Sequence, residues 1–593
     1  MLGVALPLAL LQLAIGQLSQ QDAIGVWRAV PFFKGVGYLR WLISFLGALY
    51  AVIYVSLSFT YLLYTISNTL PFWECVDMSP VDDGFVTSLN ASACLNETFM
   101  APVSSKPEYF LAVALIVLVL WIILPFIFYN PVKLMKRILY VLGPIVFTLI
   151  VVIMCYLGDS VNLSSFVKRS DWRSFVEPKI WHGALVQALL SSQVAGGYLI
   201  SSGDAMYSNT NVEWTAIIFV GMNILASWIA LLFWYLISNT EKETSVFAVL
   251  IMAYKVGEDA NTHVAWPIVI FLTLLLSGFI SLLSLLFPIY DRFLRVGGLR
   301  WRLVSVAGSV VAAAASLGVL TARQPAIVML DDYAVPLLVS FATVVEILAF
   351  IFIYGWKVLV KDVDLLTDKQ LCKLWTLGWC VAPGVLAPFT VWWIITVFRR
   401  DRDWLQPPWP AVTIIATMSL AVLIILVVAS VTVAKQVHYD LIGKLKSSFR
   451  PSRHWGPRDP ITHYYWLARR EELAKGNKVS RKYQRRQLGQ LSGLSGIRQF
   501  SGLSARPNYS TLKNSISEKV GEDTEKKRSK SDDWMYMEYR KQVQGIGKYD
   551  TERRRRAKSL DWTFPKFRPR DIVELRPTTS KESNRRIVFE ERM

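Results

Sequence analysis

The amino-acid sequence predicts an all-α, polytopic membrane protein that ends in a basic, soluble tail. Of its 593 residues, 53% are hydrophobic and 22 are tryptophan, which is more apolar surface than a single soluble core needs. Apolar segments of about 20 residues, the length of a membrane-spanning helix, recur through residues 1–435. Residues 436–593 contain 37 Lys and Arg against 19 Asp and Glu, and so carry +18 of the net charge of +19. The chain therefore divides into a nearly neutral membrane body and a cationic tail.

The membrane body contains about eleven segments with the length and apolarity of a transmembrane helix. They are 2–16, 41–66, 108–129, 138–157, 180–203, 214–238, 264–290, 303–321, 334–357, 374–398 and 411–434. The first segment can also be read as a signal peptide, but it has neither a basic n-region nor a clear cleavage site, so we count it as a span. An odd number of spans places the two ends of the body on opposite faces of the membrane.

The polar loop 67–107 predicts which face is outside. It contains glycosylation sequons at Asn90 and Asn96, and its Cys75 and Cys94 can close a disulfide. Glycans and disulfides form in oxidising compartments, so this loop is expected to be extracellular on a plasma-membrane protein. Lys and Arg gather in the alternate loops, as expected of the cytoplasmic side, at Arg28, Lys34, Arg40, Lys133, Lys136, Arg137, Arg292, Arg295, Arg300 and Arg302.

The segment 180–207 is long enough to cross a bilayer but is unusually polar in its middle. Ser191, Ser192, Gln193, Gly196 and Gly197 lie where a spanning helix is normally apolar. Irregular backbone at this depth is tolerated only where it lines a protein cavity, and broken helices hold ions and zwitterions at the membrane midplane. Close packing against a neighbouring helix through small residues is the alternative explanation.

A series of short motifs occurs in a fixed order between residues 5 and 435. The motifs are Leu11–Gln17, Trp27, Lys34–Tyr38, Gln187 with Ser191, Asn223 with Ser227, Met329–Tyr333, Glu346, and Tyr354–Gly355. In residue type and order they resemble the sodium- and chloride-dependent neurotransmitter and amino acid symporters. The resemblance implies an inverted-repeat fold of twelve spans, of which this chain lacks the first. It also implies that sodium and substrate bind at the unwound middles of the first and sixth spans, and the segment 180–207 matches the sixth.

The resemblance also implies individual site residues. Side-chain oxygens of Ser191 and Asn223 match the first sodium site, and Ser277 falls near the second. The chloride ligands match Gln187, Ser191, Asn223 and Ser227, whose amide and hydroxyl hydrogens suit an anion. Substrate is expected at Ser191, Ala195 and Gly196. Hydrogen bonding between helices is the alternative role for such residues.

Acidic residues of the body match the gates of the same family. Asp331 and Asp332 match carboxylates that close the outer vestibule, and Asp291 matches an inner-gate aspartate. The resemblance places the Arg partners of both gates in segments that this sequence does not include. The eighth span departs from the family pattern, because no Asp or Glu occurs between Ala260 and Tyr290. Gln12 stands where the family has a Glu beside the carboxyl that matches Glu346, and a neutral amide there avoids repulsion between like charges.

Residues 436–593 form a basic cytoplasmic tail with few apolar runs, for which disorder is the default expectation. Its Arg and Lys clusters favour binding to anionic membrane lipids. The alternative partner, nucleic acid, is disfavoured by attachment to a membrane body. The sequence does not indicate the oligomeric state.

The sequence contains no enzyme signature: no phosphate-binding Gly-rich loop, no HExxH and no CxxC. No cofactor is expected beyond the transported ions, Na+ and possibly Cl−. The favoured function is a sodium-coupled symporter of an amino acid or similar zwitterion. This preference over aromatic amines follows from Leu189 and Leu190, which replace an aromatic pair that would offer a cation–π surface. The alternative is a non-transporting or truncated relative that acts as a receptor, trafficking or regulatory partner.

Overall fold

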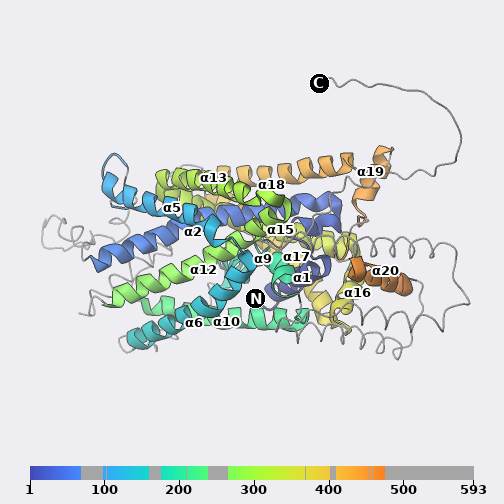
Figure 1. Cartoon of the computed structure of the whole chain (residues 1–593), viewed down its shortest axis with the longest axis horizontal. Helices are drawn as coiled ribbons and strands as arrows, with labels where there is room; N and C mark the ends of the chain where they lie inside the picture. The colour runs from blue at the N-terminus through green and yellow to red at the C-terminus, as the bar shows by residue number, and fades with distance from the viewer. Residues whose placement is uncertain are drawn as a thin grey trace, which may run out of the picture. The chain divides into compact units, whose positions relative to one another are not determined.

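The structure is a computed structural model that describes residues 1–67, 98–99, 101, 103–158, 175–208, 210–237, 265–367, 369–400, 409–437, 439–452, 455–458 and 460–474. The chain divides into two compact units, Met1–Asn477 and Lys478–Met593. All described residues belong to the first unit, which is a helical bundle (Figure 1). The predicted disulfide Cys75–Cys94, the glycosylation sites Asn90 and Asn96, and most of the basic tail lie outside the described residues.

Helices account for every predicted span. The body contains α1 (Ala5–Ser19), α2 (Lys34–Ile66), α5 (Pro107–Ile127), α6 (Pro131–Gly158), α8 (Pro178–Ser191), α9 (Tyr198–Ala205), α10 (Val212–Ile237), α12 (Ala265–Val296), α13 (Trp301–Thr321), α14 (Arg323–Val328), α15 (Val335–Ile347), α16 (Trp356–Thr367), α17 (Lys373–Arg400) and α18 (Trp409–Ala434). Two π-helical segments, η5 (Met329–Ala334) and η6 (Leu348–Gly355), flank α15. Within the described residues, nine helices are long and apolar enough to cross a membrane, and Ala5–Ser19 and Ile180–Ser191 are shorter apolar helices.

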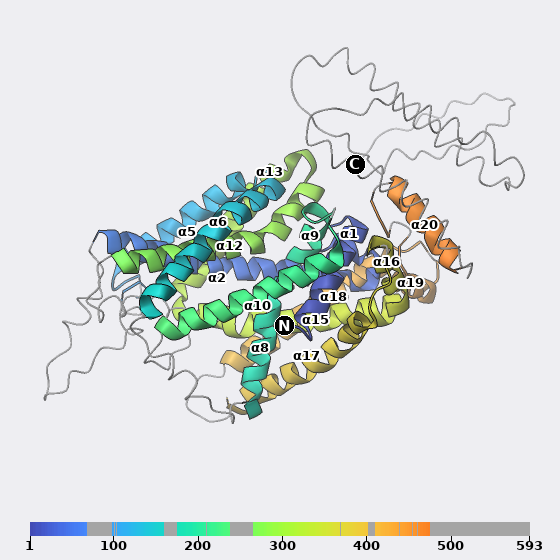
Figure 2. The same cartoon turned by 90° about the horizontal axis from the view of Figure 1, so that it is seen from below.

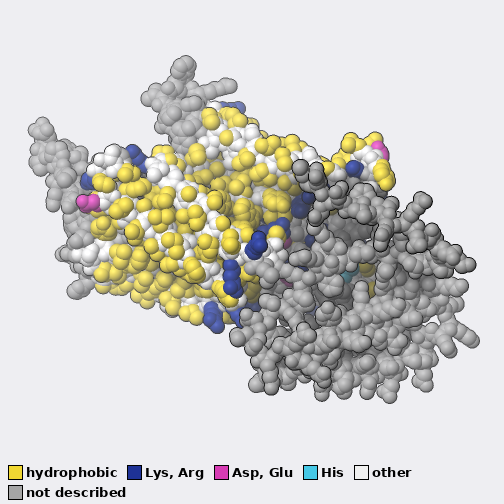
Figure 3. Space-filling model, turned by 45° about the horizontal axis from the view of Figure 1, so that its top comes forward, with side chains coloured by type: hydrophobic (Ala, Val, Ile, Leu, Met, Phe, Trp, Pro, Cys, Tyr) yellow, Lys and Arg dark blue, Asp and Glu magenta, His cyan; other side chains and the backbone are white. Residues whose placement is uncertain are grey.

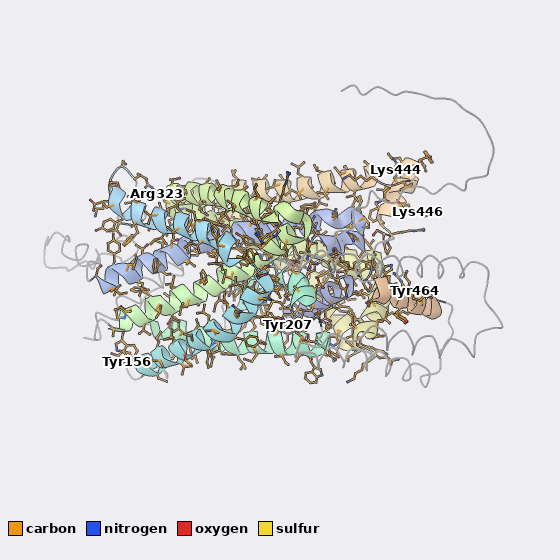
Figure 4. The ribbon with its side chains drawn as sticks, in the orientation of Figure 1. Tyr156, Tyr207, Arg323, Lys444, Lys446 and Tyr464 are labelled. Carbon is orange, nitrogen blue, oxygen red and sulfur yellow. The ribbon has the colours of Figure 1, made fainter. Side chains whose placement is uncertain are left out.

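The outer surface of the bundle is apolar, as contact with lipid requires. Along α10, Trp214, Ile218 and Met222 are each at least 60% exposed. Figure 3, which turns the top of Figure 1 toward the viewer, shows hydrophobic side chains over most of the described surface on that side as well. The ends of the bundle are marked in Figure 4, where Tyr156 and Arg323 lie at one end and Lys444, Lys446 and Tyr464 at the other. The exposed apolar belt between these ends fits a membrane-spanning body.

The centre of the bundle is formed where α1 packs closely against α9. Figures 1 and 2 both show these two helices side by side. A Cβ on Gly16 of α1 would come within 2.2 Å of the Ile200 carbonyl oxygen, and one on Gly203 within 2.9 Å of the Leu13 carbonyl oxygen. Because each contact involves backbone, only glycine allows the two helices to approach this far.

Arg40 is the residue whose predicted place was wrong. The charge pattern predicts it in a cytoplasmic loop before a span at 41–66, but α2 begins at Lys34 and Arg40 is fully buried inside the bundle. A buried guanidinium requires an anion and hydrogen-bond acceptors, and Glu346 of α15 supplies the anion. The span therefore starts earlier in the sequence than its apolar run.

The packed region also continues past the predicted tail boundary at residue 435. Two helices follow α18, namely α19 (Leu441–Ser448) and α20 (Pro460–Ala474). Trp455 and Trp466 are only 2% and 5% exposed. Their indole nitrogens donate hydrogen bonds to the Tyr354 hydroxyl at 2.9 Å and to the Asp362 carboxylate at 3.2 Å. The start of the tail is thus anchored to the body by two tryptophans.

Candidate functional site

A broken helix lies at the centre of the candidate site. Helix α8 ends at Ser191 and α9 begins at Tyr198, and residues 192–197 between them form turns. Two residues of this break have positive φ angles, Gln193 at 56° and Gly197 at 78°. Glycine adopts this conformation without strain, and a Cβ on Gly197 would also come within 2.7 Å of the Ala23 Cβ. The predicted helix break is present, but α8 already ends at Ser191, and Gly197 forms the N-cap of α9.

The amide groups at the start of the break remain bonded to α8. The N–H groups of Val194 and Ala195 donate to the Leu189 carbonyl at 3.1 and 3.3 Å. Because these bonds span five and six residues instead of four, the chain forms a wider turn than an α-helical one as it leaves α8. Within the break, the Gly197 carbonyl accepts a hydrogen bond from the Ser201 N–H of α9 at 3.2 Å, whereas the carbonyls of Val194, Ala195 and Gly196 bond side chains of other helices.

Side chains from α1 and α2 bind those carbonyl groups. The Arg40 Nη1 donates to the carbonyl oxygens of Val194 and Ala195 at 2.6 and 2.7 Å. The Ser44 hydroxyl donates to the Gly196 carbonyl at 2.8 Å, and the Gln12 amide donates to the Val194 carbonyl at 3.1 Å. Backbone polar groups inside a membrane must be satisfied by protein, and here α2 satisfies three successive carbonyls.

The arginine that bonds the break also forms a buried ion pair. The Arg40 Nε bonds the Glu346 carboxylate, and the two side chains are 0% and 1% exposed. The other carboxylate oxygen of Glu346 accepts a hydrogen bond from the Gln12 amide at 3.0 Å. The predicted pairing of Gln12 with Glu346 is therefore confirmed. Arg40 provides the positive charge that balances this carboxylate.

A chamber of about 550 Å³ lies on the open side of the break. Its walls come from α2, from the broken helix and from α12, and its lining residues are Tyr50, Ala51, Tyr54, Val55, Ser58, Gln187, Leu190, Ser191, Gln193, Ala195, Gly196, Leu274, Ser277, Gly278, Ser281 and Leu285. None of these side chains carries a formal charge. The volume suits a small molecule, and the mixed lining of hydroxyl, amide and apolar groups is typical of a ligand site.

Most of the predicted site residues line this chamber. Ser191, Ala195 and Gly196 come from the broken helix, Gln187 lies one turn before Ser191, and Ser277 lies on α12. The Ser277 hydroxyl donates to the Leu274 carbonyl of its own helix at 3.1 Å. Five of the seven substrate and ion residues implied by the resemblance are thus brought to one cavity by α8, by the break that follows it and by α12.

Asn223 and Ser227 lie on α10 beside this chamber wall. The Asn223 amide donates to the Ser191 hydroxyl at 3.1 Å, and that hydroxyl donates to the Gln187 carbonyl at 2.7 Å. The Ser227 hydroxyl donates to the Asn223 carbonyl at 2.8 Å, and its side chain is on an exposed part of α10. Ser191, Gln187 and Asn223 therefore form a connected group, whereas Ser227 lies at its edge.

The outer-gate prediction has a structural counterpart in two tyrosines. Tyr54, which lines the chamber, donates its hydroxyl hydrogen to the Asp331 carboxylate at 3.1 Å, and Tyr50 also hydrogen-bonds Asp331. Asp332 follows in η5 and is exposed. The resemblance did not indicate these tyrosines, although their i, i+4 spacing on an apolar helix places both on one face.

The inner-gate residue Asp291 belongs to a larger charge cluster. The Arg295 Nε bonds both Asp291 carboxylate oxygens at 2.9 and 3.0 Å, and Arg295 Nη2 bonds Asp204 of α9 at 2.7 Å. Next to it, Arg292 bonds Asp22 at 3.0 Å. Asp291 thus has an arginine partner within its own helix. The cluster joins α12 to α9 and to the turn after α1.

The sequence is similar to that of known transport proteins. The sequence profile of the Sodium:neurotransmitter symporter family matches residues 1–438. The chain is 24% identical over 522 residues to the mouse sodium- and chloride-dependent neutral and basic amino acid transporter B(0+), covering 76% of this chain and 81% of that protein. It is 23% identical over 529 residues to the Xenopus laevis sodium- and chloride-dependent glycine transporter 1, covering 76% and 80%.

A solved structure shows the same fold. The crystal structure of MhsT in complex with L-phenylalanine superposes with a TM-score of 0.52 at 16% sequence identity, over 66% of this chain and 88% of MhsT. The family consists of secondary transporters rather than enzymes, and its members move small solutes together with sodium ions. The match over residues 1–438, the broken helix and the shared fold lead to one conclusion. This chain belongs to the sodium:neurotransmitter symporter family.

Proposed function

We propose that this protein is a secondary-active symporter that moves an amino acid or a related small zwitterion inward, driven by the sodium gradient and linked to chloride. The observation that supports it best is the helix break at residues 192–197 beside a chamber of about 550 Å³. Broken helices with such a chamber are where transporters bind substrate and coupling ions. The relatives named above are sodium- and chloride-dependent transporters of amino acids.

A zwitterion suits the electrostatics of this chamber. Its lining contains hydroxyl and amide groups but no formally charged side chain, so a ligand with net charge would lack a counter-charge on the walls. Helix α9 starts at Tyr198, immediately after its N-cap Gly197, and no side chain caps this helix N-terminus. The partial positive charge of this helix end favours a carboxylate.

Ser191 and Asn223 are the proposed sodium ligands. The Ser191 hydroxyl lies 3.1 Å from the Asn223 amide nitrogen, so rotation of that amide would bring two neutral oxygens together. Sodium is a hard cation and prefers such oxygen donors. Ser277 lies on the opposite wall of the chamber and is the proposed residue of a second site, which has no carboxylate within the α12 segment of the chamber lining.

Chloride is proposed to bind at Gln187, Ser191, Asn223 and Ser227. The Asn223 amide bonds the Ser191 hydroxyl, and that hydroxyl bonds the main-chain carbonyl of Gln187. The side-chain N–H and O–H groups of the four residues can turn toward an anion. Asp331 and Asp332 remain the proposed outer-gate residues, and Asp291 remains the proposed inner-gate residue. We also propose that the protein lies in the plasma membrane and that its cytoplasmic tail binds anionic lipids. The extracellular loop is proposed to contain the Cys75–Cys94 disulfide and glycans at Asn90 and Asn96.

Uptake by the purified full-length chain in proteoliposomes tests the function. Radiolabelled glycine, leucine, phenylalanine and lysine are presented with an inward gradient of sodium or of choline, and with chloride or gluconate. We expect uptake of at least one neutral amino acid that requires sodium and falls when chloride is replaced. Sodium-independent uptake would refute sodium coupling.

Two variants assign that uptake to the site. We expect Asn223→Ala to lower sodium-dependent uptake by at least about tenfold, which is the equivalent of losing one good ligand at 1.4 kcal/mol. Ser430→Ala is the matched control, because the Ser430 hydroxyl bonds only its own helix on an exposed part of α18. Equal effects of the two substitutions would contradict the site assignment.

A non-transporting receptor or regulatory partner is the second candidate. The observations in its favour are the guanidinium fixed in the helix break and the absence of an acidic residue from the α12 segment of the chamber lining. Saturable amino acid binding without uptake under any gradient would support this function, and uptake would exclude it.

A further inference from the structure

Arg40 occupies the position at the helix break where a transporter of this architecture can hold a cation. Unwound carbonyl groups and the C-terminal ends of half-helices attract cations in broken transmembrane helices. Here the carbonyl oxygens of Val194 and Ala195 both accept hydrogen bonds from Arg40 Nη1, at 2.6 and 2.7 Å. The cation at these carbonyls is therefore part of the protein.

The groups around the guanidinium make up a set of oxygen ligands. Besides the two carbonyls, it contacts the Glu346 carboxylate through Nε and the Thr343 hydroxyl at 3.4 Å through Nη2. One anionic and three neutral oxygens on two different elements therefore face a single positive charge. Hard monovalent and divalent cations are held by donor sets of this kind.

Gln12 supplies a further oxygen that Arg40 does not bond. This oxygen is independent evidence that the site contains more oxygen ligands than the guanidinium uses. Its amide nitrogen bonds Val194 and Glu346, which fixes the orientation of the amide because both partners are acceptors. Its Oε1 is fully buried and has no hydrogen-bond partner among the described residues. A buried acceptor without a partner is costly, and an oxygen so placed is available to a bound cation.

We propose that Arg40 is a tethered cation filling a latent monovalent-cation site formed by Glu346, the Val194 and Ala195 carbonyls and Gln12. The break is then held in a cation-loaded state whatever ions surround the protein. The consequence for transport rests on the proposed function: the sodium dependence is confined to Ser191, Asn223 and the second site. The latent site itself does not depend on transport.

Removing the tethered charge should uncover the site. In Arg40→Ala, the Glu346 carboxylate and the two carbonyls face a cavity the size of the lost side chain. We expect the melting temperature of this variant to fall in choline chloride and to recover by at least half in low millimolar guanidinium chloride or in sodium chloride of equal ionic strength. The wild-type protein should not respond to low millimolar guanidinium.

The measurement is thermal unfolding of the purified full-length chain in detergent, followed by tryptophan fluorescence. It is made in an Asn223→Ala, Ser277→Ala background, so that a sodium response at either proposed sodium site does not contribute. Adding Glu346→Gln to Arg40→Ala should abolish recovery by either cation, because the anionic ligand is gone. Arg302→Ala removes an exposed arginine and should behave as wild type.

Two results would overturn the proposal. One is an Arg40→Ala protein whose stability is unchanged by both cations, and the other is a recovery that persists after Glu346→Gln. If Arg40→Ala does not yield folded protein, Arg40→Gln keeps part of the side chain and one uncharged NH2 donor group and is judged by the same criteria. Because guanidinium recovery requires no substrate, a protein that fails to transport can still pass or fail this test.

Discussion

Replacing Gly16 by alanine tests the close approach of α1 and α9 on which the broken helix depends. The added Cβ would lie 2.2 Å from the Ile200 carbonyl oxygen and 3.0 Å from its carbonyl carbon. An ordinary contact begins at 3.4 Å, so the two backbones must separate by about 1.2 Å. Both contacts are with backbone, and no side-chain rotation can relieve them.

The magnitude follows from that geometry. Overpacking a closely packed interior costs about 1–3 kcal/mol, and we expect the upper end here because a whole helix must move. Gly16 lies one turn after Gln12, whose amide bonds Val194 in the break. The displacement should therefore loosen the break as well as lower stability. We expect the substrate affinity of Gly16→Ala to fall together with its melting temperature.

The assay is thermal unfolding of the purified chain, with Gly143→Ala as the matched control. Gly143 is also inside a transmembrane helix, but a Cβ there meets nothing within 4 Å. Alanine at such a position should stabilise the helix by about 0.5–1 kcal/mol. If Gly16→Ala melts at or above the temperature of Gly143→Ala, the proposed backbone contact between α1 and α9 is wrong.

Three further predictions concern the charge cluster at the end of α12, the anchor of α20 and the wall of the chamber. Arg295→Ala leaves Asp291 and Asp204 without their shared partner and should cost about 3 kcal/mol in thermal unfolding, while Arg295→Lys should recover part of it; equal stability of the two variants would count against the ion pairs. Trp466→Ala removes the buried indole that bonds Asp362, so trypsin should cleave within α20 several times faster; an unchanged cleavage rate would show that this tryptophan does not anchor the segment. Tyr54→Phe removes a hydrogen bond to Asp331 worth about 1 kcal/mol and should raise the KM of uptake with little change in melting temperature, an expectation that an unaltered KM would contradict.

Much of the fold could be predicted from the sequence because each spanning helix must be apolar by itself. Lipid leaves no choice of partner, so a run of about 20 apolar residues indicates a helix without knowledge of its neighbours. The break at residues 192–197 could be predicted equally locally, because polar residues and paired glycines interrupt an apolar segment there, and Gly197 takes the positive φ that precedes α9. The motifs led to Ser191, Ala195 and Gly196, and these residues do line the chamber.

Only the tertiary structure decided where the charges lie. Arg40 follows basic residues of a predicted loop, yet it is buried because Glu346, 306 residues away in the sequence, meets it inside the bundle. The same holds for Tyr54, whose partner Asp331 is 277 residues away. From the sequence pattern alone, a charged residue is expected outside the membrane, because burying a charge costs free energy. Whether an opposite charge offsets that cost depends on which helices pack together. The apolar spans and the helix break were therefore determined by the sequence, and the cation at that break was decided by packing.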